Sequence, residues 1–228
     1  MHPTAMHNCQ AFFSCYSKSI DTATKVRVIE IGSQDVNGSL RSVVPPQYEY
    51  IGLDFVAAKG VDIILTDPYS LPFEDESVDI ILSSSCFEHS EMFWLVFLEI
   101  LRVLKPEGLF YLNAPSSGNF HRYPVDCWRF YPDSGRALIT WAKRNGIGAA
   151  MLESYTQKGG SWQDYVAVFL KNEQLADRFP NRIIDTKTDF SNGSAHSRSE
   201  IINLSELTED NKKFLVINQI VQGQLTIN

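Results

Sequence analysis

Five short runs of mostly apolar residues recur along the first half of the chain, and polar or turn-forming segments separate them. Each run has the nearly continuous apolar character of a strand that is buried on both faces of a parallel sheet. Their alternation with turns and helices predicts an α/β fold with a doubly wound, Rossmann-like and mostly parallel sheet. The runs occupy residues 26–31, 48–53, 61–65, 78–82 and 109–112.

Two helices and a hairpin complete the expected core. Residues 91–104 carry apolar side chains at helical spacing, and Pro106 is expected to help end that helix because proline cannot continue it. A second helix is expected at residues 132–144, with a proline in its first turn. The apolar runs 151–156 and 165–170 flank a glycine-containing turn, which predicts a C-terminal antiparallel hairpin at the sheet edge.

The length of 228 residues suits one domain with some surplus at its ends. We expect an N-terminal helical extension at residues 1–24, the α/β domain at residues 25–171, and a partly irregular C-terminal extension at residues 172–228. An apolar run that begins at Phe214 is too apolar for a free tail. It is expected to pack on the core or on a second subunit, which would make a homodimer through the C-terminal extension.

Composition and charge narrow the classes of partner. A hydrophobic fraction of 44% supports a buried core, and a net charge of -7 argues against broad binding to nucleic acid or to an anionic membrane. The sequence contains no apolar stretch near the roughly 20 residues that cross a bilayer, and it begins without a signal-peptide pattern. We therefore expect a cytoplasmic protein. The four cysteines lack metal-ligand spacing, so reduced thiols and no metal site are predicted.

A loop with glycine at both ends follows the first predicted strand. Gly32 and Gly38 bound it, and glycine lets a backbone turn sharply and approach a bound cofactor closely. Glu30 precedes the loop and Ser33 lies inside it. A pair of glycines in a turn also occurs without any ligand, so the loop alone leaves both interpretations open.

Acidic residues follow the next two predicted strands. Asp54 ends the second strand, and a carboxylate there can accept both hydroxyls of an adenosine ribose. An aspartate after a strand can also be a helix cap. Asp67 lies just past the third strand, where a carboxylate can accept the adenine amino group. Their coincidence with the glycine loop favours nucleotide binding.

Residues 26–112 resemble the class I S-adenosylmethionine-dependent methyltransferases, especially the small-molecule group called methyltransferase type 11. That family has an acidic glycine loop, an acid after the second strand and an Asp after the third. A Glu-His segment then follows the fourth strand, and the next helix ends in Leu-Lys-Pro-Glu-Gly. The last two features are Glu88-His89 and residues 104–108 in this chain.

The resemblance implies that S-adenosylmethionine is the cofactor. Glu30 and the Gly32 loop would hold its amino acid end, while Asp54 would bind the ribose and Asp67 the adenine. The family's loop alternates glycines at every second position, whereas Ser33, Gln34 and Val36 stand inside this one. The candidate cofactor residues are Glu30, Gly32, Ser33, Gly38, Asp54, Asp67 and Ser83.

Two histidines and a long connection are the candidates for the acceptor side. If the acceptor is a hydroxyl, His89 and His121 are placed to act as general base, although loop histidines are also often structural. Residues 113–131 follow the fifth strand at the edge where ligands bind in such folds. The candidate acceptor residues are Asn113, Arg122, Tyr123, Asp126, Trp128 and Arg129.

The aromatic and ionic groups of this connection suit a small-molecule acceptor such as a sugar or sugar nucleotide. The same string resembles methyltransferases of surface-polysaccharide synthesis, which implies O-methylation of such an acceptor. The alternative is a self-packed lid in which Arg122 and Arg129 pair with Asp126.

Two other functions stay open. A nicotinamide-dependent oxidoreductase also needs a glycine turn and an acid on the ribose, but the chain has neither GxGxxG nor a Tyr-x-x-x-Lys pair. A catalytically silent methyltransferase fold that serves as a binding module is compatible with the irregular loop.

Overall fold

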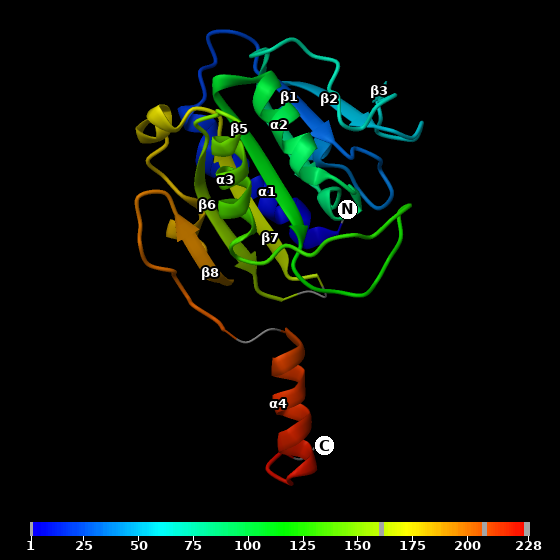
Figure 1. Cartoon of the computed structure of the whole chain (residues 1–228), viewed down its shortest axis with the longest axis vertical. Helices are drawn as coiled ribbons and strands as arrows, with labels where there is room; N and C mark the ends of the chain where they lie inside the picture. The colour runs from blue at the N-terminus through cyan, green and yellow to red at the C-terminus, as the bar shows by residue number, and fades with distance from the viewer. Residues whose placement is uncertain (1, 160–161, 207–208, 226–228) are drawn as a thin grey trace.

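One eight-stranded sheet runs through the centre of the protein in the computed structural model, which describes residues 2–159, 162–206 and 209–225 (Figure 1). The strand order is β3-β2-β1-β4-β5-β7-β6-β8. The strands are β1 (Arg27–Ile31), β2 (Glu49–Asp54), β3 (Ile63–Ile64), β4 (Val78–Ser84), β5 (Leu104–Pro115), β6 (Ala150–Gln157), β7 (Asp164–Leu170) and β8 (Phe190–Ala195).

The first five strands are parallel, as the apolar runs predicted. β1 pairs with β2 on one side and with β4 on the other, and β4 pairs with β5. The strand order therefore reverses direction between β1 and β4. In open α/β sheets, a reversal of this kind leaves a crevice at the carboxyl ends of the strands, where ligands bind.

Helices cover both faces of the sheet (Figure 1). α2 (Phe93–Val103) and α3 (Ser134–Arg144) pack on one face, and α1 (Pro3–Tyr16) packs on the other. Ile81 of β4 points into the first of these two cores, whereas its neighbours Ile80 and Leu82 point into the second. Burial on both faces explains why the parallel strands read as nearly continuous apolar runs.

The predicted end of α2 is confirmed. The helix ends at Val103, and β5 begins at the next residue. The pairing of β5 with β4 then passes from Leu104 directly to Leu109. Pro106 lies in this irregular part. Its lack of an N–H therefore removes no hydrogen bond between the paired strands.

The antiparallel strands are confirmed, with one addition. β7 pairs with both β5 and β6, but β6 is not the edge of the sheet because β8 pairs with its outer side. The sequence analysis placed this segment in an irregular extension. After Phe190 its residues are small and mostly polar, and such residues have a low intrinsic preference for strands. Main-chain pairing with β6 forms the strand nevertheless. Gly193 fits because a Cβ there would lie 2.5 Å from the Phe190 ring.

The segment before β8 is tied to the core by a buried carboxylate. Glu153 of β6 accepts hydrogen bonds from the Tyr16 hydroxyl (2.6 Å) and from the backbone N–H groups of Ile183 (2.8 Å) and Ile184 (3.1 Å). These bonds join α1, the sheet and the 3-10 helix Ile183–Asp185. The three-part domain division predicted above stays a prediction.

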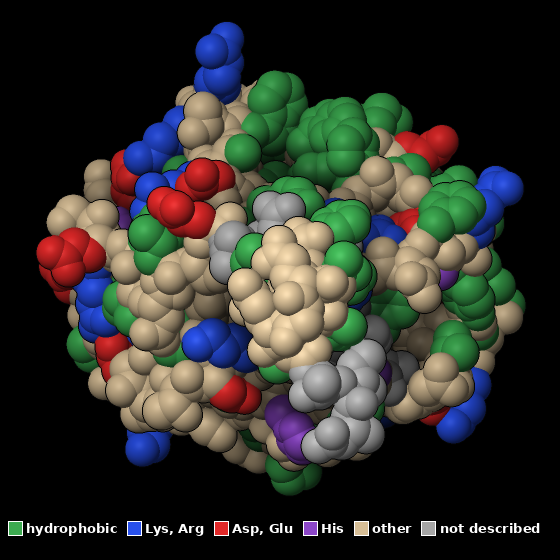
Figure 2. Space-filling view, turned by 90° about the horizontal axis from the view of Figure 1, so that it is seen from below, with side chains coloured by type: hydrophobic (Ala, Val, Ile, Leu, Met, Phe, Trp, Pro, Cys, Tyr) green, Lys and Arg blue, Asp and Glu red, His purple; other side chains and the backbone are tan. Residues whose placement is uncertain are grey.

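The last helix stands apart from the rest of the protein. α4 (Glu209–Val221) projects below the body in Figure 1 and carries exposed apolar residues that include Phe214 and Ile217. Every helix in the described residues is too short or too polar to span a membrane. The four cysteines are all free. Acidic and basic side chains are interspersed on the face drawn in Figure 2.

Candidate active site

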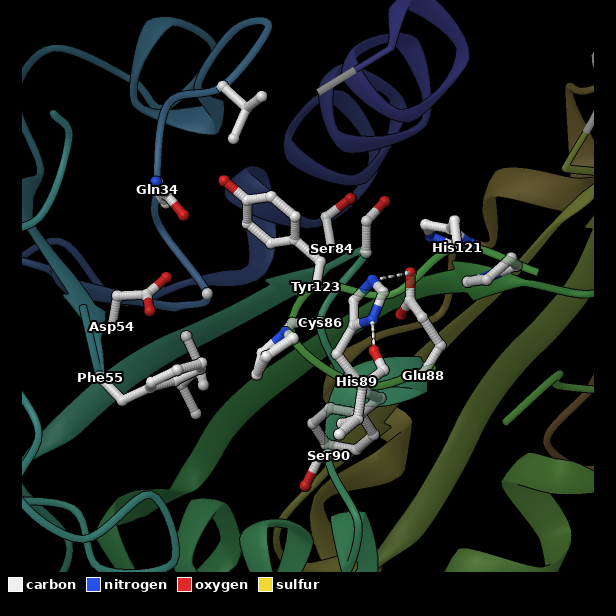
Figure 3. Close-up of a pocket in the computed structure, with 18 of the residues that line it drawn as sticks. Gln34, Asp54, Phe55, Ser84, Cys86, Glu88, His89, Ser90, His121 and Tyr123 are labelled. Carbon is white, nitrogen blue, oxygen red and sulfur yellow. Dashed lines mark hydrogen bonds and ion pairs between the residues drawn. The ribbon is translucent and has the colours of Figure 1, made fainter. Parts of the chain in front are cut away.

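A cleft of about 1010 Å³ opens at the carboxyl ends of β1, β2 and β4 (Figure 3). Binding sites for small molecules usually enclose about 300–1,000 Å³. The cleft therefore has room for a nucleoside-sized ligand and a second small molecule. Asp54 and Phe55 lie at one end, whereas Glu88 and His121 lie at the other.

Gly32 forms the start of one wall because only glycine fits there. Its φ is +81°, and a Cβ built on it would lie 2.6 Å from the Cβ of Cys86. The backbone N–H groups of Gly32 and Ser33 both donate to the carbonyl of Leu53, at 2.9 and 3.0 Å. The loop is thus held against β2 while its backbone runs along the cleft.

The other predicted loop residues lie behind that wall. Ser33 is buried against Gly52, and the N–H of Gly38 donates to the carboxylate of Asp35 at 2.8 Å. Neither residue lines the cleft, whereas Gln34, Val36 and Asn37 do. Gln34 is one of the departures from the family's glycine pattern, and the structure places it on the cleft surface.

Glu30 lies beneath the loop, outside the cleft. It is 1% exposed and accepts a hydrogen bond from the Tyr50 hydroxyl. Burial raises the pKa of the Glu30 carboxyl to about 7, although the Tyr50 hydrogen bond and the charge of Arg41 act in the opposite direction. Its position can support the loop, but the carboxyl is not part of the cleft lining.

Asp54 is the acid that does line the cleft. It is the last residue of β2, it is 8% exposed, and its Oδ1 accepts a hydrogen bond from the N–H of Val56 at 3.2 Å. Phe55 and Val56 follow it on the same wall and are 49% and 41% exposed. A carboxylate beside an exposed apolar surface suits a ribose with its attached base.

Two further cofactor candidates lie away from this wall. Asp67 is exposed, and its carboxylate accepts a hydrogen bond from the N–H of Tyr69 at 2.9 Å. Pro68 and Tyr69 line the cleft, but Asp67 does not. Ser83 is fully buried within β4, and its neighbour Ser84 takes the place in the lining.

The opposite end of the cleft holds both candidate bases. His89 belongs to the 3-10 helix Phe87–His89 that follows β4, and His121 belongs to the long connection after β5. Their rings lie edge to face with centroids 4.9 Å apart. His89 Nε2 is 3.7 Å from the Glu88 carboxylate, and Figure 3 shows these two side chains facing each other.

Burial shifts the pKa values at this end. Glu88 is 1% exposed, and desolvation raises the pKa of its carboxyl to about 8. Desolvation also lowers the pKa of His89, and His121 reinforces that shift. Both shifts favour uncharged side chains, which is the usual response of buried groups that lack a full set of partners.

Backbone hydrogen bonds fasten the acceptor connection to this end. The N–H groups of Cys127 and Trp128 donate to the carbonyl of Glu88 at 2.7 and 3.2 Å, and the N–H of Phe130 donates to Pro115 at 2.9 Å. The connection therefore returns across the cleft instead of extending into solvent.

The predicted acceptor residues divide into two groups. Arg122 and Tyr123 line the cleft. Asp126 and Arg129 instead form a bidentate ion pair at 2.6 and 2.9 Å, and the Arg129 hydrogen bonds hold the pKa of Asp126 well below its usual value. The self-packed alternative is thus correct for Arg129. It is wrong for Arg122, whose Nε donates to the carbonyl of Pro124.

Trp128 and Asn113 also lie outside the lining. The Trp128 indole donates to the carbonyl of Ser90 at 2.9 Å and packs on Phe93 and Trp94 at the start of α2. Asn113 is buried under α1, where it accepts a hydrogen bond from Asn8 at 3.1 Å. Trp128 can position the connection, whereas Asn113 belongs to the core.

Glu88, His2, Trp162 and Asp164 are among the lining residues that were not named as candidates from the sequence. Glu88 had a signal in the Glu-His segment, but only the structure shows its burial. Asp164 begins β7 and approaches the ring of His2, with Nε2 and Oδ1 3.5 Å apart. The Trp162 ring lies 4.5 Å from that of His121. These last three come from chain segments without a recognisable motif.

Comparison with known proteins finds methyltransferases. A sequence profile described as a methyltransferase domain matches residues 37–112. An uncharacterised methyltransferase of Mycobacterium leprae (strain Br4923) is 44% identical over half of this chain and 49% of its own length. Residues 37–112 thus match the methyltransferase-domain family, which supports a class I S-adenosylmethionine-dependent methyltransferase.

Other relatives of this methyltransferase domain differ in what their names describe. Phthiotriol/phenolphthiotriol dimycocerosates methyltransferase 1 of Mycobacterium ulcerans (strain Agy99) is 31% identical over 46% of this chain and 45% of its own. The chain spans less than half the length of the curated relatives it matches.

Solved structures match the fold of the methyltransferase domain. A putative sarcosine dimethylglycine methyltransferase from Galdieria sulphuraria has a TM-score of 0.56 at 16% identity, covering 74% of this chain and 86% of that one. The 1,6-didemethyltoxoflavin-N1-methyltransferase of Burkholderia thailandensis has a TM-score of 0.54 at 14% identity, covering 74% and 79%. At these identities the likeness concerns the fold alone.

Proposed function

We propose that the protein transfers a methyl group from S-adenosylmethionine to a small-molecule acceptor. One observation carries this proposal. A single cleft has the Gly32 turn and the Asp54 carboxylate at one end, and Glu88 with two histidines at the other. A methyltransferase needs a nucleoside site and an acceptor site that share one space, and this cleft offers both.

The residues at the first end fit the cofactor. Asp54 would accept the ribose hydroxyls, and the exposed faces of Phe55 and Val56 would cover the adenine. Gly32 would let the backbone approach the amino acid end, with Glu30, Ser33, Gly38 and Ser83 supporting the loop and strand from behind. The bound sulfonium supplies an activated methyl group, so the protein mainly aligns donor and acceptor. The role of Asp67 at the adenine stays a prediction.

The residues at the second end fit an acceptor that is methylated on an oxygen atom. His89 and His121 each have a ring nitrogen near the cleft that can accept a hydroxyl proton. Arg122 and Tyr123 would orient the acceptor by a charge-assisted hydrogen bond and by ring stacking. These features support a sugar or sugar nucleotide. The name of the Mycobacterium ulcerans relative suggests a lipid as the competing acceptor class.

One fold relative binds a cofactor product together with a second small molecule. The Burkholderia thailandensis structure contains both S-adenosylhomocysteine and 1,6-didemethyltoxoflavin. A small molecule as acceptor is therefore compatible with the fold. The silent binding module stays the second candidate, because Gln34 occupies a position where the family pattern has glycine.

Calorimetry with S-adenosylhomocysteine tests the proposal. We expect micromolar binding, and Asp54→Ala should weaken it by about 1.5–3 kcal/mol, the usual range for hydrogen bonds to a charged group. Asp177→Ala removes an exposed aspartate outside the cleft and serves as the matched control. Absence of binding would favour an unrelated ligand, whereas binding without methyl transfer to any sugar, sugar nucleotide or lipid acceptor would favour the silent module.

Two expectations about the whole protein stay predictions. The exposed apolar residues of α4, Phe214 and Ile217 among them, support a homodimer through the C-terminal extension. Light scattering across a concentration series tests this association. The cytoplasmic location rests on the sequence alone.

A further inference from the structure

Three potential metal ligands converge at the acceptor end of the cleft. Glu88, His89 and His121 each offer one ligand atom, and these atoms all lie within 4.8 Å of one another. Sequence spacing could not reveal this group, because His121 comes from a different connection of the sheet. All three residues line the cleft, so a bound ion would be reachable from it.

Both histidines are held in the tautomer that leaves Nε2 free to bind a metal ion. His89 Nδ1 lies 2.5 Å from the carbonyl oxygen of Val125, and His121 Nδ1 lies 3.1 Å from that of Asn119. A carbonyl oxygen can only accept, so each Nδ1 carries the hydrogen and each neutral ring keeps its lone pair on Nε2. Metal-bound histidines usually show this arrangement.

A carboxylate stands behind one of these histidines. Asp126 Oδ2 is 3.3 Å from His121 Nδ1, and Arg129 holds the same carboxylate from the other side at 2.9 Å. Carboxylate–histidine–metal chains of this kind orient the ring and make its free nitrogen a better donor. The ion pair that the sequence analysis treated as a self-packed lid therefore also positions a potential ligand.

The third ligand has an unused oxygen. Glu88 is 1% exposed, and its Oε2 is buried without a hydrogen-bond partner among the described residues. A buried carboxyl oxygen without a partner costs free energy. The backbone carbonyl of Glu88 accepts hydrogen bonds from Cys127 and Trp128, so the segments that carry the ligands are tied to each other.

We propose that Glu88, His89 and His121 bind one divalent transition-metal ion such as Zn²⁺. Two imidazoles and one carboxylate suit Zn²⁺ and its neighbours better than Mg²⁺ or Ca²⁺, which prefer oxygen ligands. Bond lengths of about 2.1 Å place donor atoms roughly 3–4 Å apart. Small side-chain rotations close the remaining gap, and His121, whose side chain is 35% exposed, has room for them.

Three protein ligands leave at least one coordination position open. In catalytic zinc sites that position takes water or substrate. Because all three ligands line the cleft, that position would be open to an oxygen atom of the acceptor. This consequence rests on the proposed function, whereas metal binding itself does not. It narrows the acceptor to a molecule with a metal-binding oxygen, such as a hydroxyl next to a second oxygen.

Titration of the metal alone tests the site. Full-length protein without a histidine tag is stripped with EDTA and titrated calorimetrically with ZnCl₂, and one site of micromolar or tighter affinity is expected. His121→Ala should weaken it by more than about 100-fold, because loss of an outer partner alone costs roughly 10–100-fold. Asp126→Asn should fall in that smaller range. His7→Ala, on the exposed side of α1, is the control.

The absorption spectrum of bound Co²⁺ gives a second readout that needs no activity. Visible bands that disappear in Glu88→Gln and His121→Ala support the site. Absence of binding, or binding that survives both changes, overturns it. Titration of the same variants with S-adenosylhomocysteine separates the metal site from the proposed methyltransferase function. The affinity of each variant for S-adenosylhomocysteine should stay within twofold of the wild-type value. If the cofactor binds and zinc does not, only the metal proposal fails.

Discussion

The two ends of the cleft are built in different ways. At the end proposed to bind the cofactor, called the cofactor end, Gly32 and Asp54 lie at the carboxyl ends of β1 and β2, whose register pairs Ile31 with Leu53. At the end proposed to bind the acceptor, called the acceptor end, His89 and His121 lie on a short 3-10 helix and a long connection. Regular strands position the first pair, whereas a few polar contacts such as the Asp126–Arg129 ion pair position the second.

This difference suggests that cofactor binding and acceptor specificity depend on separate parts of the protein. Parallel strands buried on both faces leave little freedom at their ends, so the cofactor end is a fixed part of the fold. The connection between β5 and α3 can change in sequence without disturbing the sheet, because connections tolerate substitution better than the elements they join. If the comparison is right, changes at one end should leave the function of the other end intact.

The largest effect is expected at the acceptor end. His89→Phe keeps an aromatic ring beside His121 and Tyr123 but removes the nitrogen at the cleft. Turnover should fall by about 10²–10⁴-fold, the usual contribution of a general base. If the Nε2 lone pair of His89 instead binds the metal ion, it cannot accept a proton, and turnover falls because a ligand is lost. Initial rates with a labelled methyl donor measure this.

S-adenosylhomocysteine affinity is the control for that variant. It should change by less than twofold, because His89 does not touch the wall formed by Asp54 and Phe55 (Figure 3). An equal loss of affinity and turnover would break the comparison, since the two ends would then act as one unit.

The second effect concerns the support of the cofactor end. The pKa of Glu30 is raised to about 7 in the folded protein, above the ordinary value of 4.5. Because the folded protein holds the Glu30 proton more tightly than the unfolded chain does, protonated Glu30 contributes to the free energy of unfolding. This contribution is fully present below pH 4.5 and is lost as the pH rises through 7. The variant Glu30→Gln cannot ionise at this position, so its free energy of unfolding should not show this decrease. The groups that face Glu30 are Tyr50, Arg41, Asp35, Cys9 and Cys86.

Denaturant unfolding between pH 5 and 8 measures this difference. The free energy of unfolding of the wild type should fall relative to Glu30→Gln by up to about 3 kcal/mol, from about 1.4 kcal/mol for each unit of pKa shift. Parallel curves for the two proteins would show that Glu30 ionises as easily as an exposed glutamate. The carboxyl beneath the Gly32 loop would then be accessible to solvent, in contrast to the burial seen in the structure.

The same comparison explains how much could be predicted from the sequence. The five parallel strands, the end of α2 and the Asp54 wall follow from local apolar patterns and short motifs, and the structure has them. β8 was missed because its residues after Phe190 are small and mostly polar, and only main-chain pairing with β6 makes them a strand. The burial of Glu88 and its approach to His121 depend on how the connection folds back, and no local pattern specifies that.

The smallest effect is expected where the connection touches α2. Trp128→Phe keeps the contacts with Phe93 and Trp94 but removes the hydrogen bond to the Ser90 carbonyl. One net hydrogen bond is worth about 0.5–1.5 kcal/mol, so KM for the acceptor should rise by roughly two- to twelvefold while kcat stays nearly constant. Trp141→Phe removes a similar indole bond, to the carbonyl of Trp94, outside the cleft and is the matched control. If only Trp128→Phe raises KM, a contact outside the cleft lining positions the acceptor. If neither does, the connection is held by its backbone bonds to Glu88, and acceptor specificity resides in the side chains of the lining alone.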